Sequence, residues 1–172
     1  GWESALLLVP WYLYLYQGDT RILEESYPNF KKYMDRLAAA DYMNKNPSGW
    51  LGDWVPVSDK RMCPEAVIHA GYHYQDAKIT ALAARLLGRN GEAEKHEAAA
   101  AGVKKTFREK YVDPATGRVN VPRGTQTAAS WALHQGLAGE KDRAALTEQL
   151  VEEIARWKGH VECGIFGAKA IL

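Results

Sequence analysis

The stretch that decides the fold is residues 64–111, PEAVIHAGYHYQDAKITALAARLLGRNGEAEKHEAAAAGVKKTFREKY. Pro64 suits the first turn of a helix, and Gly88 interrupts the helical pattern midway through the stretch. The spacing of apolar residues predicts one helix over 64–87 and a second over 92–111, joined by a tight turn as an antiparallel hairpin. The expected core stripes are Ile79, Leu82, Ala83 and Leu86 in the first helix and Ala100, Val103, Phe107 and Tyr111 in the second.

Helical periodicity continues on both sides of this hairpin. Further helices are predicted over 2–17, 21–41, 125–137 and 141–158, followed by the start of another in 164–172. The first is so apolar that we expect it to be buried on most sides and kinked at Pro10, and Tyr27-Pro28 predicts an irregularity in the second. No strand-like alternation of useful length occurs in the sequence. The predicted class is therefore all-α, with about six helices as three antiparallel hairpins and the longer loops at one end.

Composition and charge argue against several classes of protein. Lys and Arg number 22 against 21 Asp and Glu, so the net charge of +1 gives no basic surplus for nucleic acid. The longest apolar run, 5–16, contains Pro10 and is too short for a membrane span of about 20 residues. Cys63 and Cys163 match no zinc spacing and form no disulfide framework. We expect no metal or cofactor, and the free cysteines weakly favour the cytoplasm.

The ends of the sequence predict a piece of a larger domain. The chain begins at Gly1-Trp2 without an initiator methionine or signal peptide and ends in the apolar stretch 164–172. At about 150 residues per domain, residues 1–172 are expected to form one unit, a single fragment of a catalytic domain. Six helices of this kind leave apolar flanks that a second copy of the chain is expected to cover, so a homo-oligomer such as a dimer is predicted.

An ordered set of motifs resembles bacterial α-L-rhamnosidases of glycoside hydrolase family 78. Gly52-Asp53-Trp54 is similar to that family's Gly-Asp-Trp, and the resemblance spans nearly the whole chain. Glu3 stands where the family usually has Asp, and Cys163 stands where Thr is common. The other stretches that carry the resemblance are Trp2-Glu3-Ser4-Ala5, Val9-Pro10-Trp11, Tyr14, Gly18-Asp19, Ala83 to Gly88, Thr125 to Ala128 and His160 to Gly167.

The resemblance implies a partial (α/α)6 barrel from an inverting glycosidase that removes terminal rhamnose. Inversion needs a protonated carboxylic acid at the leaving oxygen and a carboxylate that activates water, roughly 6.5–9.5 Å apart. In the resemblance the acid lies upstream of Trp2 and the base downstream of Leu172. The catalytic residues of this chain are therefore left unassigned, and its expected role is to form part of the cleft for a rhamnoside-type carbohydrate.

Five residues are the candidate sugar contacts. Asp53 would accept hydrogen bonds from vicinal hydroxyls, and Trp54 would stack on the C–H face of a sugar. The alternative for this turn is structural, with Asp53 capping backbone amides and Trp54 covering the barrel floor. Trp50 and Trp2 also have two interpretations, sugar contact or packing, and Glu3 is included through the resemblance.

Other side-chain pairs offer alternative functions. His69 and His73 are four residues apart, as in a two-histidine zinc site, although Ala70 follows where a metalloprotease has glutamate. Ser130 and His134 have the same spacing, but no Gly-x-Ser-x-Gly or Ser-x-x-Lys motif accompanies them. An autonomous half-barrel with esterase-type activity therefore stays open, as does a non-enzymatic helical interaction module. Cys63 at a helix start has two interpretations, a thiol of lowered pKa or a packed, inert thiol.

Overall fold

The fold is all-helical, as the sequence predicts. The structure is a computed structural model, and it describes residues 2–41, 52–58 and 62–172. Within those residues the only β-type pairing is an isolated bridge between Val112 and Val119. The helices are α1 (Ala5–Gln17), α2 (Arg21–Ala40), α4 (Glu65–Leu86), α5 (Asn90–Tyr111), α6 (Thr125–Gln135), the 3-10 turn η2 (Glu140–Asp142), α7 (Arg143–Arg156) and α8 (Ile165–Ile171).

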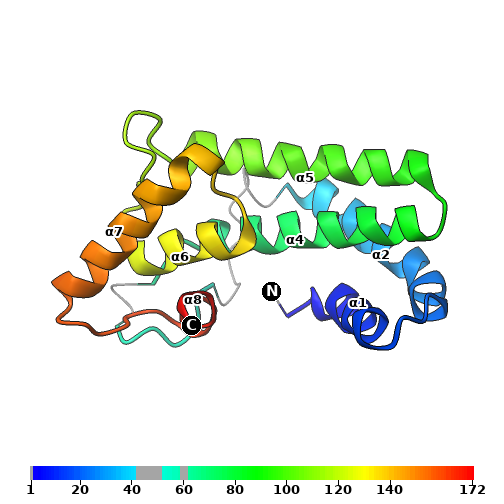
Figure 1. The fold of residues 1–172 in the computed structure, drawn as a ribbon, viewed down its shortest axis with the longest axis horizontal. Coiled ribbons are helices and arrows are strands. Elements are labelled where there is room, and N and C mark those ends of the chain that lie inside the picture. The colour runs from blue at the N-terminus through cyan, green and yellow to red at the C-terminus, as the bar shows by residue number, and fades with distance from the viewer. Residues whose placement is uncertain (1, 42–51, 59–61) are drawn as a thin grey trace.

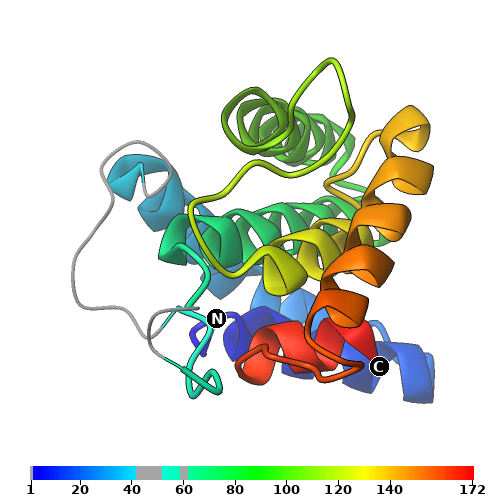
Figure 2. The same ribbon diagram turned by 90° about the vertical axis from the view of Figure 1, so that its left-hand side faces the viewer.

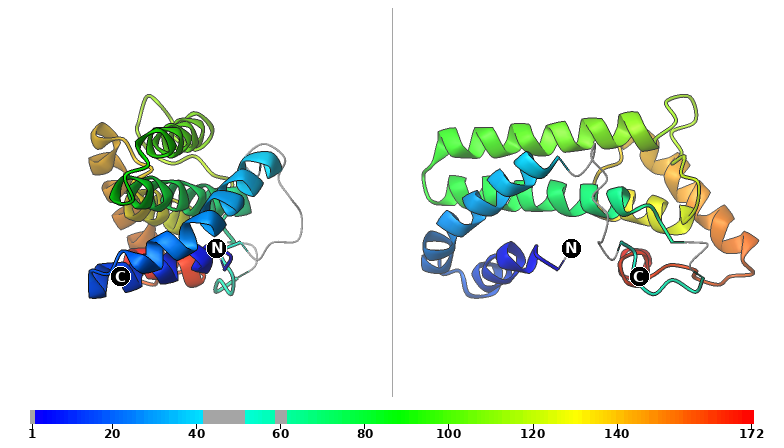
Figure 3. Two further views of the ribbon diagram at one scale, coloured as in Figure 1. Left: turned by 90° about the vertical axis from the view of Figure 1, so that its right-hand side faces the viewer. Right: turned by 180° about the vertical axis from the view of Figure 1, so that it is seen from behind.

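The helices alternate between two layers. Helices α1, α4, α6 and α8 follow one another side by side, because α1 contacts α4, α4 contacts α6 and α6 contacts α8. Each of α2, α5 and α7 packs against the outside of this row, and α2 crosses α4 obliquely when the molecule is seen from behind (Figure 3). Inner and outer helices joined as consecutive hairpins form part of an (α/α)6 barrel wall.

The longer connections gather at one end of the wall. Residues 52–58, 112–124 and 157–164 lie on the left in Figure 1, whereas the tight turns after α1 and α4 lie on the right. The first turn closes at Gly18, whose φ of 72° is a left-handed conformation that favours glycine. The expected separation of long and short loops is therefore confirmed for the described residues.

Two apolar clusters hold the layers together, and α4 belongs to both. One surrounds Trp131 and Phe107 between α4, α5, α6 and α7, and the other surrounds Tyr27 and Phe30 between α1, α2, α4 and α5. The long hairpin of α4 and α5 contributes residues to both clusters, so it connects them along the length of the wall (Figure 1).

Several sequence expectations about packing are wrong. Within α1 only Leu7 is fully buried, because the helix lies at an edge of the wall, where α2 and α4 are its main contacts among the described helices. Helix α2 continues through Pro28 without interruption. In the predicted α4 stripe Ile79 and Ala83 are buried, whereas Leu82 and Leu86 are half exposed.

The close contact between α4 and α6 depends on Gly71 in α4. A Cβ at Gly71 would lie 2.0 Å from Nε1 of Trp131, whose indole N–H donates to the Ile68 carbonyl. Gly71→Ala is expected to destabilise the fold by about 2–3 kcal/mol, because the fully buried Trp131 ring would have to move away from α4. Gly102→Ala, in α5 with open space around it, should stabilise by about 0.5–1 kcal/mol. Urea unfolding checks both, and equal effects would contradict the packing argument.

Candidate functional site

The Asp53 carboxylate joins distant parts of the chain at the end of the wall where the longer loops lie. It is fully buried and accepts four hydrogen bonds from residues that lie far away in sequence. Oδ2 accepts from the Thr127 hydroxyl at 2.5 Å and from the Gly164 amide at 2.8 Å. Oδ1 accepts from the amides of Phe166 and Gly167 at 3.0 and 3.1 Å. The carboxylate thereby satisfies orphan amides at the start of α8 and fastens it to α6.

Two glycines allow the chain to approach this carboxylate so closely. Gly52 has a φ of 53°, which turns the chain into Asp53. A Cβ at Gly164 would lie 2.3 Å from the Asp53 carbonyl and 2.4 Å from the Trp54 carbonyl, so only glycine fits. The Trp54 carbonyl also accepts from the Ile165 amide at 2.9 Å. The Gly-Asp-Trp turn is therefore fixed to the first turn of α8.

The Trp54 side chain stays accessible on this fixed turn. It is 43% exposed, next to Val55, whose φ of 56° is unusual for a branched residue. The turn and the start of α1 lie on the side of α4 that faces away from α5, as Figures 1 and 2 both show. An exposed indole on a rigid turn suits stacking against a sugar face.

Trp2 and Glu3 lie at the start of α1. Trp2 is 65% exposed, so the packed interpretation of this residue is wrong for the described chain. The Glu3 carboxylate pairs through Oε1 with the Arg36 guanidinium at 3.1 Å, and its Oε2 is buried without a hydrogen-bond partner. Trp50, the remaining candidate, lies outside the described residues.

A second buried carboxyl, that of Asp76, contacts Ser4, the residue that follows Trp2 and Glu3. Asp76 in α4 is fully buried, and its Oδ2 accepts a hydrogen bond from the Ser4 hydroxyl at 2.6 Å. Its Oδ1 is buried without a partner. Burial raises the Asp76 pKa from 3.8 to about 7, although the Ser4 hydrogen bond acts in the opposite direction. The pair fixes the start of α1 against α4.

The histidine pair on α4, His69 and His73, is half-buried. Burial lowers the pKa of His69 to about 4 and also lowers that of His73. Across the described residues, no group of three or more His, Cys, Asp or Glu is arranged to hold a metal ion.

The structure also disfavours the two nucleophile hypotheses. The Ser130 hydroxyl is buried and donates to the Thr127 carbonyl at 3.1 Å, while His134 stacks on Trp131. Burial raises the pKa of the Cys63 thiol, so of its two interpretations the packed, inert thiol is confirmed and the thiol of lowered pKa is wrong. Cys63 belongs to the core around Trp131, and the Ser130 hydroxyl is buried.

Sequence reasoning missed two parts of this arrangement. Nothing in the local pattern links Ser4 to Asp76, 72 positions apart. The structural alternative for the Gly-Asp-Trp turn, in which Asp53 caps backbone amides, is confirmed, but the sequence gives no sign that these amides belong to Gly164 and Phe166. Both pairings join residues that are distant in sequence, so only the tertiary fold reveals them.

The alternating inner and outer helices define part of an all-helical barrel wall, and comparison with known proteins gives the family. The model of the bacterial alpha-L-rhamnosidase 6-hairpin glycosidase domain matches residues 1–172. This chain therefore belongs to that family of 6-hairpin glycosidase domains.

Individual relatives agree with this assignment. An alpha-L-rhamnosidase of Formosa agariphila is 28% identical over 97% of this chain and 18% of its own length. The crystal structure of Streptomyces avermitilis alpha-L-rhamnosidase complexed with L-rhamnose is 28% identical, with a TM-score of 0.80 over 95% of this chain and 15% of that one. An alpha-L-rhamnosidase structure from Dictyoglumus thermophilum is 26% identical, with a TM-score of 0.84 over 99% and 20%. The chain spans a fifth or less of these relatives.

None of the described helices is both long enough and apolar enough to cross a lipid bilayer.

Proposed function

We propose that this chain forms part of the sugar-binding wall of an inverting glycoside hydrolase that acts on terminal α-L-rhamnosides. The observation that supports it most is the family match over residues 1–172, together with the likeness to a rhamnosidase solved with L-rhamnose. The acid and base of the reaction would come from other parts of such an enzyme. The chain alone is therefore expected to bind the sugar without hydrolysing an aryl α-L-rhamnoside.

Within this proposal the candidate residues have different roles. Trp54 supplies the stacking surface, because it is exposed on a fixed turn. Asp53 acts as a positioning residue through α8, because four protein donors already occupy its carboxylate. Trp2 and Glu3 form a second contact region at the start of α1, which Ser4 and Asp76 hold in place.

The other two hypotheses are not favoured. Membership of a glycosidase family argues against a purely non-enzymatic interaction module. An autonomous esterase would require an accessible nucleophile beside a base, whereas the Ser130 hydroxyl is buried and donates to a backbone carbonyl.

Titration with L-rhamnose, followed by NMR of the 15N-labelled chain, tests the sugar site. The wild-type chain is expected to show shifts at the Trp54 indole and in residues 52–58. Trp54→Ala should weaken binding about five- to tenfold, because roughly 1 kcal/mol of ring stacking is lost. Trp54→Phe should retain part of the affinity, because the smaller ring can still stack on the sugar. Val151→Ala, which removes an exposed apolar side chain from α7, is the control and should bind like the wild type.

Two results would overturn the proposal. Unchanged affinity in Trp54→Ala would remove the stacking surface from the site. Turnover of an aryl acetate by the chain, abolished in Ser130→Ala but retained in Trp54→Ala, would favour the esterase hypothesis instead.

We also propose that the isolated chain pairs with a second copy through α1. Leu6, Val9, Leu13 and Tyr16 are exposed and share one face of this helix, at spacings of three and four residues. Light scattering should give twice the 19.2 kDa mass of one chain, and Val9→Glu should restore the monomer. A monomeric wild-type chain at high concentration would rule out this pairing.

A further inference from the structure

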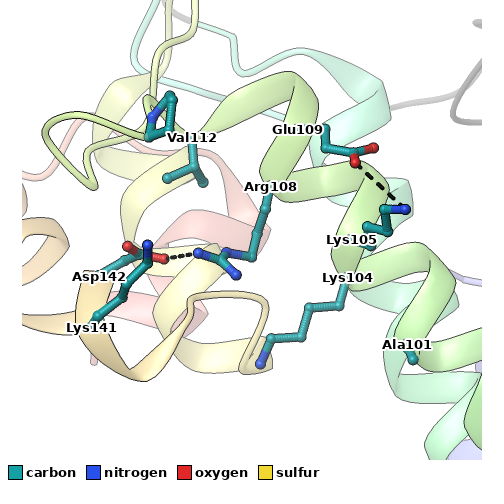
Figure 4. A pocket seen from close by; sticks show the side chains of 9 residues that line it. Ala101, Lys104, Lys105, Arg108, Glu109, Val112, Lys141 and Asp142 are labelled. Carbon is teal, nitrogen blue, oxygen red and sulfur yellow. Dashed lines mark hydrogen bonds and ion pairs between the residues drawn. The ribbon is translucent and has the colours of Figure 1, made fainter.

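The outer side of the wall carries a groove that the proposed sugar site does not use. It has a volume of about 640 Å³ and lies between α5 and the connection into α7 (Figure 4). That size is within the range of small-molecule sites. The residues around it are Ala101, Lys104, Lys105, Arg108, Glu109, Val112, Pro114, Lys141 and Asp142.

Positive charge dominates this groove. Four cations line it against two carboxylates, an excess of two charges in a chain whose net charge is +1. The cations are Lys104, Lys105, Arg108 and Lys141, and they come from two separate parts of the chain. The pKa of Lys104 is lowered by burial and then by repulsion from Arg108 and Lys78, so a bound anion would relieve that repulsion.

The four cations of the groove differ in how far they are engaged by other protein groups. Arg108 donates through Nη2 to Asp142 at 2.7 Å, while its Nε is buried without a hydrogen-bond partner. Lys105 is only 3.8 Å from Glu109, and both side chains are exposed. In the part of the chain that the structure describes, Lys141 has no ion-pair or hydrogen-bond partner, and its side chain extends beside Asp142 (Figure 4).

The groove is also held in shape by close packing. Asp142 is buried beneath Arg108, and a Cβ at Gly139 would lie 2.6 Å from its Oδ2. Lys104 donates to the Gly136 carbonyl at 2.7 Å. Because these contacts link α5 to the connection before α7, they hold Lys104 and Arg108 beside that connection. Ala101, Val112 and Pro114 add an apolar surface beside them.

We propose that this groove binds a small organic phosphate monoester. The excess of two positive charges matches a phosphate dianion, and lysine and arginine donors suit its oxygens. The organic group of the ester would pack against the apolar surface of Ala101, Val112 and Pro114. This site is independent of the sugar site, because it lies on the opposite side of the α4 and α5 hairpin from α1 and α8 (Figure 1).

NMR titration of the 15N-labelled chain with phenyl phosphate at pH 7.5 tests this proposal. Shifts are expected in residues 101–114 and 139–142. Phenyl phosphate should bind at least fivefold more tightly than inorganic phosphate, because of the apolar surface. It should also bind more tightly than phenyl sulfate, which has the same shape and one charge fewer. Added salt should weaken binding.

Charge variants locate the site. Lys141→Gln should weaken phenyl phosphate binding about fivefold, and Lys105→Ala with Lys141→Gln about twentyfold. Neither variant removes a buried contact, so both should keep the wild-type circular dichroism. Lys95→Ala, which removes an exposed charge from the other end of α5, is the matched control and should bind within twofold of the wild type.

Three results would overturn the assignment. Equal loss of affinity in Lys95→Ala and Lys141→Gln would mean diffuse attraction to lysines. Equal binding of inorganic phosphate would exclude an organic ligand. Equal or tighter binding of phenyl sulfate would exclude the match to a dianion.

Discussion

Asp53→Ala is expected to lower the free energy of unfolding by about 3–5 kcal/mol. The substitution leaves four donors without their acceptor, and three of these are backbone amides at the start of α8. Asp53→Asn should be nearly as damaging, because an amide NH2 would then face either two backbone amides or the Thr127 hydroxyl and an amide. Urea unfolding measures the effect, and hydrogen exchange should show early loss of protection in α8.

Asp113→Asn provides the matched control for this experiment. Asp113 is also an aspartate that accepts a backbone amide, from Ala115 at 2.8 Å, but on an exposed turn. Its replacement should cost less than about 1 kcal/mol. If Asp53→Ala kept wild-type stability and lost only rhamnose binding, the carboxylate would be a direct sugar contact and the positioning role would be wrong.

Asp76→Asn is expected to stabilise the protein at neutral pH and to have little effect near pH 3.5. Folding raises the Asp76 pKa from 3.8 to about 7, so the folded state binds the proton more tightly. The stability that this group contributes is fully present below pH 3.8 and is lost as the pH rises towards 7. The loss amounts to about 4 kcal/mol by linkage, and asparagine avoids it because it carries no charge.

The difference between variant and wild type is the quantity to measure. His69, whose pKa falls from 6.5 to about 4, adds stability with rising pH over much of the same range, and His73 shifts in the same direction. Both contributions are present in the variant and the wild type, so they cancel in the difference. Urea unfolding between pH 3.5 and 8 should show the difference growing with pH. A constant difference for Asp76→Asn would contradict the argument.

The sequence predicted the helices well because their signals are local. Apolar spacing located α5 and α7, Gly18 marked the end of α1, and Pro64 marked the start of α4 to within a residue. The resemblance of short ordered motifs predicted the family, which the match over residues 1–172 confirms. These features depend on residues that are close together in the chain, so a single sequence carries them.

Burial was predicted less well, because it depends on which neighbours the fold supplies. Leu82 and Leu86 have the spacing of core residues but lie at the exposed edge of α4, and α1 is apolar on faces that no described helix covers. The periodicity of a helix reveals that it has an apolar face, but the position of that helix in the wall decides whether the face is buried.

The sequence by itself determined the all-helical class, the hairpin order, the loop end and the family resemblance, since each follows from local pattern or motif. Only the tertiary structure decided what the polar residues do. It joined Asp53 to the start of α8, Ser4 to Asp76, and Lys104 and Arg108 to the connection before α7. Hydrogen bonds and charge pairs act over a few ångströms, so their partners are set by the packing of distant segments rather than by their order in the chain.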